Sequence, residues 1–123
     1  MDKRPSEIIN DFLRFLERAE DEYRAAYADM GAEDNKLQTI LHDIEFAPNK
    51  AERNKIATKL QQSRRTRRAA KDRVTLYEKV HELYTDKQYA NLLKALRRLQ
   101  NEQVTKEKYL SGNREFKKRV EYE

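Results

Sequence analysis

The sequence contains no cysteine and no tryptophan, and only two glycines and two prolines among its 123 residues. The absence of cysteine excludes disulfide bonds and thiolate metal ligands. Turn-forming residues are rare and the helix-favouring residues Ala, Leu, Glu, Lys, Arg and Gln are abundant, so the chain should be helical almost throughout. We therefore expect an all-α fold in a single domain, the usual outcome for a chain of this length.

Long apolar runs are also missing from the sequence. No run approaches the roughly 18 residues of a membrane-spanning helix, and residues 1–20 are polar with acids at intervals, unlike a signal peptide. Charged residues make up 40% of the chain, a content that can indicate disorder. The regular apolar spacing described next argues for a folded, cytoplasmic protein with no membrane partner.

An apolar residue recurs at every seventh position over the first third of the chain, which is typical of a coiled-coil helix. These positions are Ile9, Leu16, Tyr23, Met30, Leu37 and Ile44. We expect a second line at i+4, formed by Leu13, Glu20, Tyr27, Asp34 and Leu41. With Ser6 as the N-cap and Pro48 as the breaker, the pattern predicts one helix over about 6–46, continuous through Gly31.

A second helix should begin after Asn49, which forms a capping-box pattern with Glu52, and extend over about 50–84. The residues that should face the first helix form a mostly apolar line, which consists of Ile56, Leu60, Ser63, Arg67, Ala70, Val74, Tyr77, His81 and Tyr84. Because the turn between the two helices is short, they should be antiparallel neighbours.

The two lines can be aligned by pairing residues whose numbers sum to about 100. This register places Asp34 opposite Arg67 and Glu20 opposite His81, so each acid that interrupts one line meets a base in the other. Polar layers of this kind fix the register of paired helices.

A third helix should begin near Asp86, because Thr85 and Gln88 form another capping-box pattern, and continue to about 110. Its apolar face consists of Tyr89, Leu92, Leu93, Leu96 and Leu99, continued by Val104 and Leu110. The first two helices offer surplus apolar residues to receive it, namely Ile8, Phe12, Phe15, Ala19, Leu76, Val80 and Leu83. We therefore predict a long antiparallel, coiled-coil-like hairpin with the third helix packed on its base, as a single domain of residues 1–110 followed by a basic tail, 111–123.

Charge is segregated along the chain. Residues 1–46 carry six basic and twelve acidic side chains, whereas residues 47–73 carry ten basic and two acidic ones. An acidic helix paired with a basic one explains part of this pattern, since exposed ion pairs disfavour wrong registers. The register would place Glu33 and Asp34 near Arg67 and Arg68, Asp29 near Lys71, Glu22 near Lys79, and Glu45 near Lys55.

The remaining positive charge favours a surface for nucleic acid or an acidic partner. The first helix cannot neutralise Arg64, Arg65 and Arg73 from a single flank, and exposed guanidinium groups suit phosphate contacts. The candidate binding residues are Arg64, Arg65, Arg68, Lys71 and Arg73, with Lys117, Lys118 and Arg119 in the tail, while Arg67 mainly secures the hairpin. No groove-reading motif is recognisable, so contact would be with the backbone and without sequence readout.

A metal site has little support in the sequence. Glu78 and His81 form an E-x-x-H pair, but di-iron bundles need a second such motif and two further glutamates. Glycine-rich phosphate loops and serine nucleophile elbows are absent as well. We expect no enzyme, no cofactor, no metal and no small-molecule substrate.

The segments "LHDIEF", "NKIATKLQQSRRTRRAAKD" and "KEKYLSGNREFKKRV" resemble a group of small helical proteins encoded by phages and prophages of Gram-positive bacteria. The similarity covers mainly residues 39–80 and 106–120. It implies a phage setting, in the cytoplasm of an infected or lysogenic host, and assigns no binding residue.

Three functions are compatible with these patterns. The leading hypothesis is a non-enzymatic binding protein whose basic arm, roughly residues 28–68 and the adjoining basic stretch, contacts nucleic acid or a nucleic-acid-handling complex. The first alternative is an anti-defence, anti-CRISPR-like inhibitor that binds a host nuclease complex. The second is a structural coiled-coil protein in which the arm seams of two chains pair in a homodimer.

Overall fold

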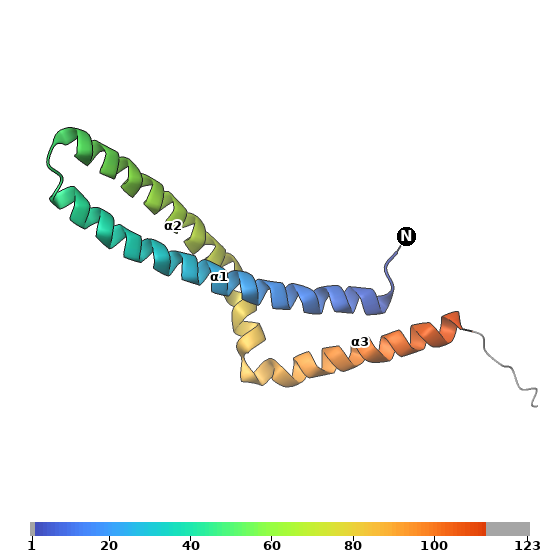
Figure 1. The fold of residues 1–123 in the computed structure, drawn as a ribbon. Coiled ribbons are helices and arrows are strands. Elements are labelled where there is room, and N and C mark those ends of the chain that lie inside the picture. The colour runs from blue at the N-terminus through green and yellow to red at the C-terminus, as the bar shows by residue number, and fades with distance from the viewer. Residues whose placement is uncertain (1, 113–123) are drawn as a thin grey trace, which may run out of the picture. The chain divides into compact units, whose positions relative to one another are not determined.

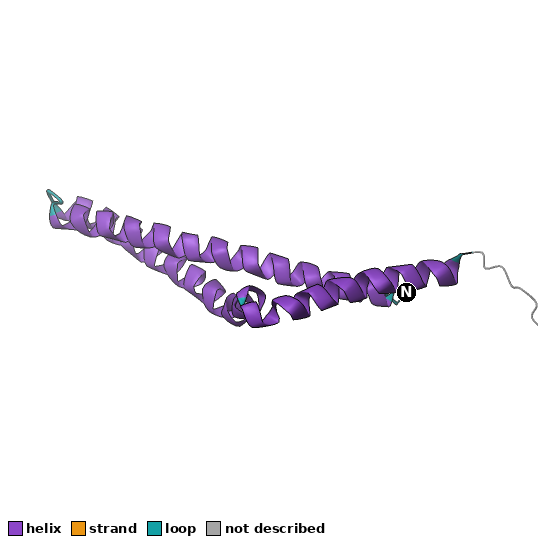
Figure 2. Cartoon of the chain, turned by 90° about the horizontal axis from the view of Figure 1, so that it is seen from below, coloured by secondary structure: helices purple, strands orange, loops and turns teal. Residues whose placement is uncertain are grey.

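The computed structural model describes residues 2–112, and helices make up most of this range (Figures 1 and 2). Helix α1 covers Pro5–Glu45, α2 covers Lys50–Thr85 and α3 covers Ala90–Ser111, with a single 3-10 turn, η1, at Lys87–Tyr89. Residues 2–112 contain no strand, so the all-α prediction is confirmed for them. No helix within this range combines the length and the apolar character needed to cross a bilayer.

The turn between α1 and α2 forms as expected. α1 continues through Gly31 and ends at Glu45, shortly before Pro48. Asn49 then caps α2, because its side-chain oxygen accepts a hydrogen bond from the Glu52 N–H at 2.9 Å. The cap satisfies one of the backbone donors that the first turn of a helix leaves unpaired.

Two other helix ends differ from the expectation. Thr85 does not cap a third helix: it is the last residue of α2, and its hydroxyl donates to the carbonyl of His81 at 2.8 Å. α3 begins only after η1 and has no side-chain cap at Tyr89. Ser6 is not the N-cap of α1 either, because the helix starts at Pro5, whose fixed φ suits the first helical position.

The chain divides into two compact units. The hairpin unit comprises Leu16–Asp86, and the terminal unit comprises the residues up to Phe15 together with those from Lys87 onward. α1 therefore contributes to both units. The single domain of residues 1–110 stays a prediction.

In the hairpin unit, α1 and α2 lie side by side in opposite directions (Figure 1). The expected line Leu16, Tyr23, Met30, Leu37 and Ile44 is buried or half-buried. Of the predicted i+4 line, Leu13, Glu20 and Asp34 are buried or half-buried, and a further buried line at i+3 consists of Ala19, Ala26, Glu33 and Ile40. Tyr27 and Leu41, which were expected in the seam, are 56% and 48% exposed. The prediction for these two residues is wrong, because the small alanines occupy the contact and larger side chains at i+4 are turned outward.

The seam of α2 matches its prediction. All nine expected residues, from Ile56 to Tyr84, are buried or half-buried, and Ser63 and Ala70 are the most deeply buried residues of this helix. The Ser63 hydroxyl donates to the Glu33 carboxylate at 2.7 Å. Moving one heptad along each helix from this pair brings Ala26 opposite Ala70. Small residues therefore face each other at the middle of the hairpin and allow the two helices to approach closely.

In the terminal unit, α3 runs antiparallel to the first turns of α1 (Figure 1). The backbone N–H and the hydroxyl of Ser6 both donate to the Glu107 carboxylate, at 3.0 and 2.5 Å. This carboxylate satisfies an otherwise unpaired N–H at the positive end of the α1 dipole. The third helix thus packs on the beginning of α1, which confirms the predicted fold class.

The apolar face of α3 was predicted only in part. Leu93 is buried, and Leu96 and Val104 are half-buried, whereas Leu92 and Leu99 are 50% and 40% exposed. On α1, the residues turned inward in this unit are Ser6, Ile9, Asn10 and Leu13. Ile8, Phe12 and Phe15, which were expected to receive the third helix, remain 57%, 46% and 40% exposed. That expectation is wrong, because α3 contacts a different stripe of α1.

The alanine contact generates a stability prediction. Ala26 is fully buried, whereas its neighbour Ala25 is exposed on the same helix. Ala26→Leu should lower the free energy of unfolding by about 1–3 kcal/mol, because the added carbons overpack a seam with no space for them. Urea unfolding followed by far-UV circular dichroism measures this loss. Ala25→Leu is the matched control and should stay close to the wild type, so equal losses in both variants would contradict the close contact.

Candidate nucleic-acid interface

The basic stretch of residues 61–73 lies in the middle of α2, within the hairpin unit. The structure sorts its cations into two groups. Arg67 and Arg73 form ion pairs with acids of α1. Arg64, Arg65, Arg68 and Lys71 are exposed, and we call these four residues the cationic patch.

Arg67 is held in the hairpin seam as predicted. Its Nε donates to the Asp34 carboxylate at 2.5 Å, and the arginine is half-buried. The structure confirms this polar layer. Arg67 is therefore already committed to an acid of α1 and is not a member of the patch.

Arg73 is also paired with α1, contrary to the expectation that this helix could not neutralise it. Its two terminal nitrogens donate to Asp29 and Glu22, each at 3.1 Å. The two acids are seven residues apart, or two helical turns, so they lie on one flank of α1 within reach of a single guanidinium fork. The hydrogen bonds that Arg73 donates to the carboxylates of Asp29 and Glu22 raise the pKa of this arginine.

Several expected ion pairs take other partners. Lys79 pairs with Glu82 at 3.3 Å and Lys55 with Glu52 at 3.6 Å, both within α2 rather than across to Glu22 or Glu45. Glu33 does not pair with the arginines either. The hydroxyl of Ser63 lowers the pKa of its carboxyl, desolvation opposes this effect, and Lys36 adds to the lowering.

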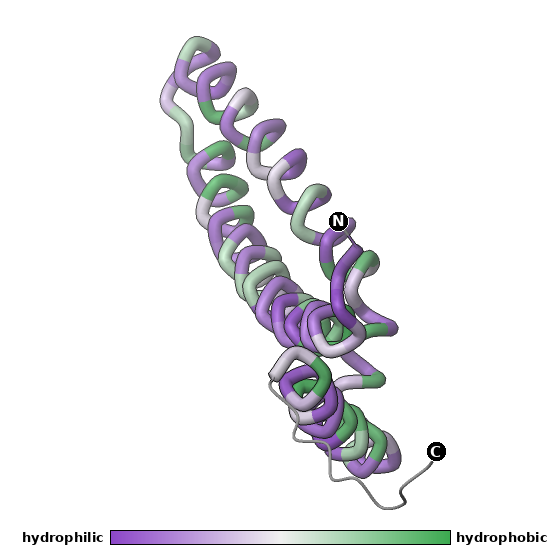
Figure 3. Tube along the Cα trace, turned by 90° about the vertical axis from the view of Figure 1, so that its right-hand side faces the viewer, coloured by the Kyte–Doolittle hydropathy of each residue, from purple (hydrophilic) through white to green (hydrophobic). Residues whose placement is uncertain are grey.

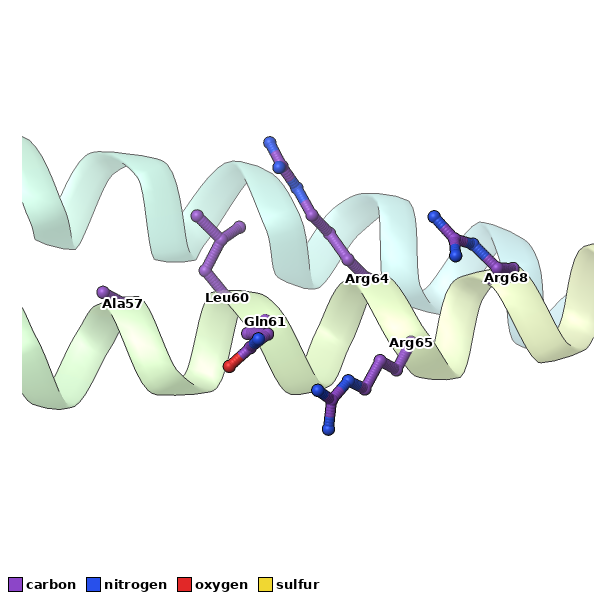
Figure 4. A pocket seen from close by; sticks show the side chains of 6 residues that line it. All are labelled: Ala57, Leu60, Gln61, Arg64, Arg65 and Arg68. Carbon is purple, nitrogen blue, oxygen red and sulfur yellow. The ribbon is translucent and has the colours of Figure 1, made fainter.

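The cationic patch consists of four side chains that form no ion pair with any residue in the range 2–112. They span eight residues of α2, or roughly 10 Å along the helix axis. Arg64 and Arg68 are one turn apart and extend from the same side of α2, and Arg65 points the other way in the view of Figure 4 but lines the same hollow.

Two hollows adjoin the patch. The first, of about 320 Å³, lies on α2 and is lined by Ala57, Leu60, Gln61, Arg64, Arg65 and Arg68 (Figure 4). The second, of about 640 Å³, reaches across to α1 and is lined by Asp34, Leu37, Arg64, Arg67, Arg68, Lys71 and Asp72. Arg64 and Arg68 line both hollows. The first lining holds three guanidinium groups and no acid, so it offers an anion several donors without a competing carboxylate.

The second predicted polar layer is also present. The Nδ1 atom of His81 donates to the Glu20 carboxylate at 2.5 Å, and the imidazole stacks on Tyr23 with ring centres 3.9 Å apart. Arg24 donates a second hydrogen bond to Glu20 at 2.7 Å. Burial raises the pKa of the Glu20 carboxyl, but the bonds from His81 and Arg24 together outweigh it and leave the pKa below its ordinary value.

The other candidate sites gain no structural support. His81 faces Glu20 across the seam, and residues 2–112 contain no group of three or more His, Cys, Asp or Glu side chains that could hold a metal ion. The tail residues Lys117, Lys118 and Arg119 lie outside the described residues, so their predicted role in binding stays a prediction.

Sequence reasoning assigned other partners to Glu22, Asp29 and Glu33, and it missed the role of Glu107. Glu22, Asp29 and Glu33 bind Arg73 and Ser63, and Glu107 binds Ser6. The signal that could have found Glu33 is its seven-residue spacing from Ala26 and Ile40, which places it in the seam. For Glu107 the sequence contains no comparable signal.

Comparison with known proteins finds no match for this chain among protein-family models, curated proteins or solved structures.

The Glu20 layer predicts a pH dependence of stability. Because the pKa of Glu20 is lower in the folded state, its contribution is present above the ordinary value of 4.5 and is lost as the pH falls through the folded-state pKa. Glu20→Gln should be less stable than wild type by about 1–3 kcal/mol at pH 7, since His81 and Arg24 lose a charged acceptor. Urea unfolding between pH 7 and 3 should show that the difference in free energy of unfolding between the wild type and Glu20→Gln becomes smaller as the pH falls. Glu17→Gln, at an exposed position, is the control; a difference that stays constant with pH argues against the layer.

The Arg73 pairs predict a difference between two arginines of the same basic stretch. Arg73→Gln should lower the urea midpoint of unfolding at low salt, because Glu22 and Asp29 then lose their shared partner, and the loss should shrink as salt screens the pairs. Arg65→Gln removes the same charge from an unpaired position and should leave the midpoint nearly unchanged. If both variants unfold at the same urea concentration, Arg73 has no special role in the hairpin.

Proposed function

We propose that this chain is a non-enzymatic binding protein whose cationic patch contacts the phosphate backbone of nucleic acid. One observation carries the proposal. Arg67 and Arg73 are neutralised by α1, yet Arg64, Arg65, Arg68 and Lys71 remain exposed without an ion-pair partner among residues 2–112. The hairpin does not need these four charges for its own pairing.

The chemistry of the patch favours phosphate as the ligand. A guanidinium group binds two phosphate oxygens at once, and three such groups surround the first hollow. A closed pocket would enclose a small molecule, whereas these hollows are partly open to solvent and are lined by exposed residues of α2. An extended polyanion fits such a surface better than a small ligand does.

The length of the patch suits a backbone contact. Roughly 10 Å along α2 equals about three nucleotides of one strand, at about 3.4 Å per nucleotide. The four residues of the patch are all cations, and the lining of the first hollow contains one amide side chain, that of Gln61. Binding should therefore depend weakly on sequence and strongly on salt.

The phage setting and the cytoplasmic location remain predictions, and the proposal does not depend on them. The anti-defence alternative differs from it in one measurable respect. An inhibitor of a nuclease complex would hold its protein partner tightly and bind free nucleic acid weakly, whereas the proposal requires direct binding to nucleic acid.

Fluorescence anisotropy with labelled duplex DNA, single-stranded DNA and RNA tests this requirement. Four phosphate contacts to a duplex should weaken binding by roughly 150-fold between 50 and 200 mM salt, from a slope of about 0.9 per contact. The combined variant Arg64→Glu, Arg65→Glu and Arg68→Glu should lose binding and keep the helical circular dichroism of the wild type.

The matched control carries the same change of charge elsewhere. Lys94→Glu, Arg97→Glu and Arg98→Glu reverse three exposed cations of α3 and should bind nearly as well as the wild type. Equal loss in both triple variants would mean that net charge alone drives binding. No binding by the wild type at 50 mM salt would sink the proposal.

A further inference from the structure

The first turns of α1 carry an apolar stripe that α3 does not cover. Ile8, Phe12 and Phe15 are spaced i, i+4 and i+7, so they share one side of the helix. Their side chains are 57%, 46% and 40% exposed. Two exposed phenylalanines and an isoleucine in one stripe are unusual on a free surface, because burying such groups is favourable.

A second exposed apolar stripe runs along α3. Leu92, Leu99 and Leu110 are 50%, 40% and 63% exposed. Leu92 and Leu110 are eighteen residues apart, or five full helical turns, and Leu99 lies in nearly the same direction between them. Figure 3 shows apolar positions recurring along this helix.

The two stripes lie on the same side of the terminal unit. The contact of Ser6 with Glu107 marks where α1 and α3 face each other. At 100° per residue, the α1 stripe lies roughly 120–180° around its helix from Ser6, and the α3 stripe lies roughly 60–80° around its helix from Glu107, in the same sense of rotation. In an antiparallel pair, positions rotated in the same sense from the contact lie on one common side. We call the six residues of the two stripes the terminal apolar face.

Few charges interrupt this face. On α1 the charged residues Glu7, Asp11, Arg14 and Arg18 recur at i, i+4, i+7 and i+11 and form a separate stripe, roughly 100° away. On α3, Lys106 lies within the leucine stripe, seven residues after Leu99, and a lysine can direct its ammonium group away from an apolar contact.

We propose that the terminal apolar face binds the same face of a second copy of this chain. A phenylalanine side chain carries roughly 200 Å² of surface and an isoleucine or leucine side chain less, and these six are about half exposed, so each copy offers at most roughly 600 Å². The total of at most roughly 1,200 Å² is at the lower end of the range for specific interfaces, which should bury more than ~1,000 Å². The face is thus large enough for a stable dimer.

The near absence of charge favours a second copy over another partner. A charged partner finds little on this face to pair with, whereas two identical apolar faces are complementary by symmetry. Each copy contributes two antiparallel helices, so the dimer contact is a four-helix bundle. This contact differs from the pairing of arm seams that the structural alternative would require, because α1 and α2 already bury those seams against each other within the chain.

The dimer does not rest on the proposed nucleic-acid binding, but it would change the consequence of that binding. Each dimer would carry two cationic patches. Two patches on one polyanion bind with higher avidity than one, provided both reach it at the same time.

Sedimentation equilibrium of the full chain over a concentration range from about 1 to 200 µM tests the proposal. The wild type should show twice the mass of one chain at the upper concentrations. Phe12→Glu combined with Leu99→Glu should weaken association at least a hundredfold, because four unpaired carboxylates would be buried in each dimer. Both positions are exposed in the single chain, so helicity should not change.

Leu76→Glu is the matched control, since Leu76 is 69% exposed in the hairpin unit and lies outside the face. It should dimerise like the wild type.

A wild-type monomer at every concentration overturns the proposal, and so does a dimer that survives the Phe12 and Leu99 changes. A wild type that stays monomeric but sediments with phosphatidylglycerol vesicles would contradict the dimer. If the double variant no longer sediments with the vesicles, the terminal apolar face binds lipid instead. Because mass is the readout, the outcome is separable from that of the anisotropy experiment.

Discussion

The contact of Ala26 with the seam of α2 is the constraint on which the hairpin depends. A fully buried methyl group opposite Ala70 leaves little distance between the two helices. At this separation the flanking side chains reach across, so Asp34 binds Arg67, and Glu22 and Asp29 bind Arg73. Arg64, Arg65, Arg68 and Lys71 form no ion pair with any residue in the range 2–112. The cationic patch is therefore what remains of the basic helix after the acidic helix has taken its partners.

Polar layers give this narrow seam its specificity. Glu33 binds Ser63, Asp34 binds Arg67, and Glu20 binds His81, all between α1 and α2. A shift of one heptad would place Glu33 opposite Ala70 or Ile56 of α2, and its carboxylate would be buried without a hydrogen bond from either side chain. Such a group costs several times more than a well-paired polar layer contributes, so the wrong register is disfavoured even though the apolar positions would still match.

Much of the hairpin could be predicted because its signals are local or repeat along the chain. The seam of α2, both charged layers and the Asn49 cap follow from spacing alone. The i+3 line of α1 could not be found in the same way, since Tyr27 and Leu41 are larger than Ala19 and Ala26 and the pattern favoured the larger residues.

Adjacent Leu92 and Leu93 pose a similar problem: both fit an apolar face, and only the position of the partner decides which one is buried. For the candidate site, exposure of four patch residues was anticipated, whereas the pairing of Arg73 depends on how far a long side chain reaches.

The bond between Ser6 and Glu107 joins residues separated by 101 positions. The hairpin forms from contacts whose partners are closer along the chain, so its loops are cheaper to close. The first turn of α1 gains its carboxylate partner only when nearly all of α3 exists. On a ribosome, the start of the longest helix would thus be the last part of the described fold to become stable, after the residues that follow it have already paired.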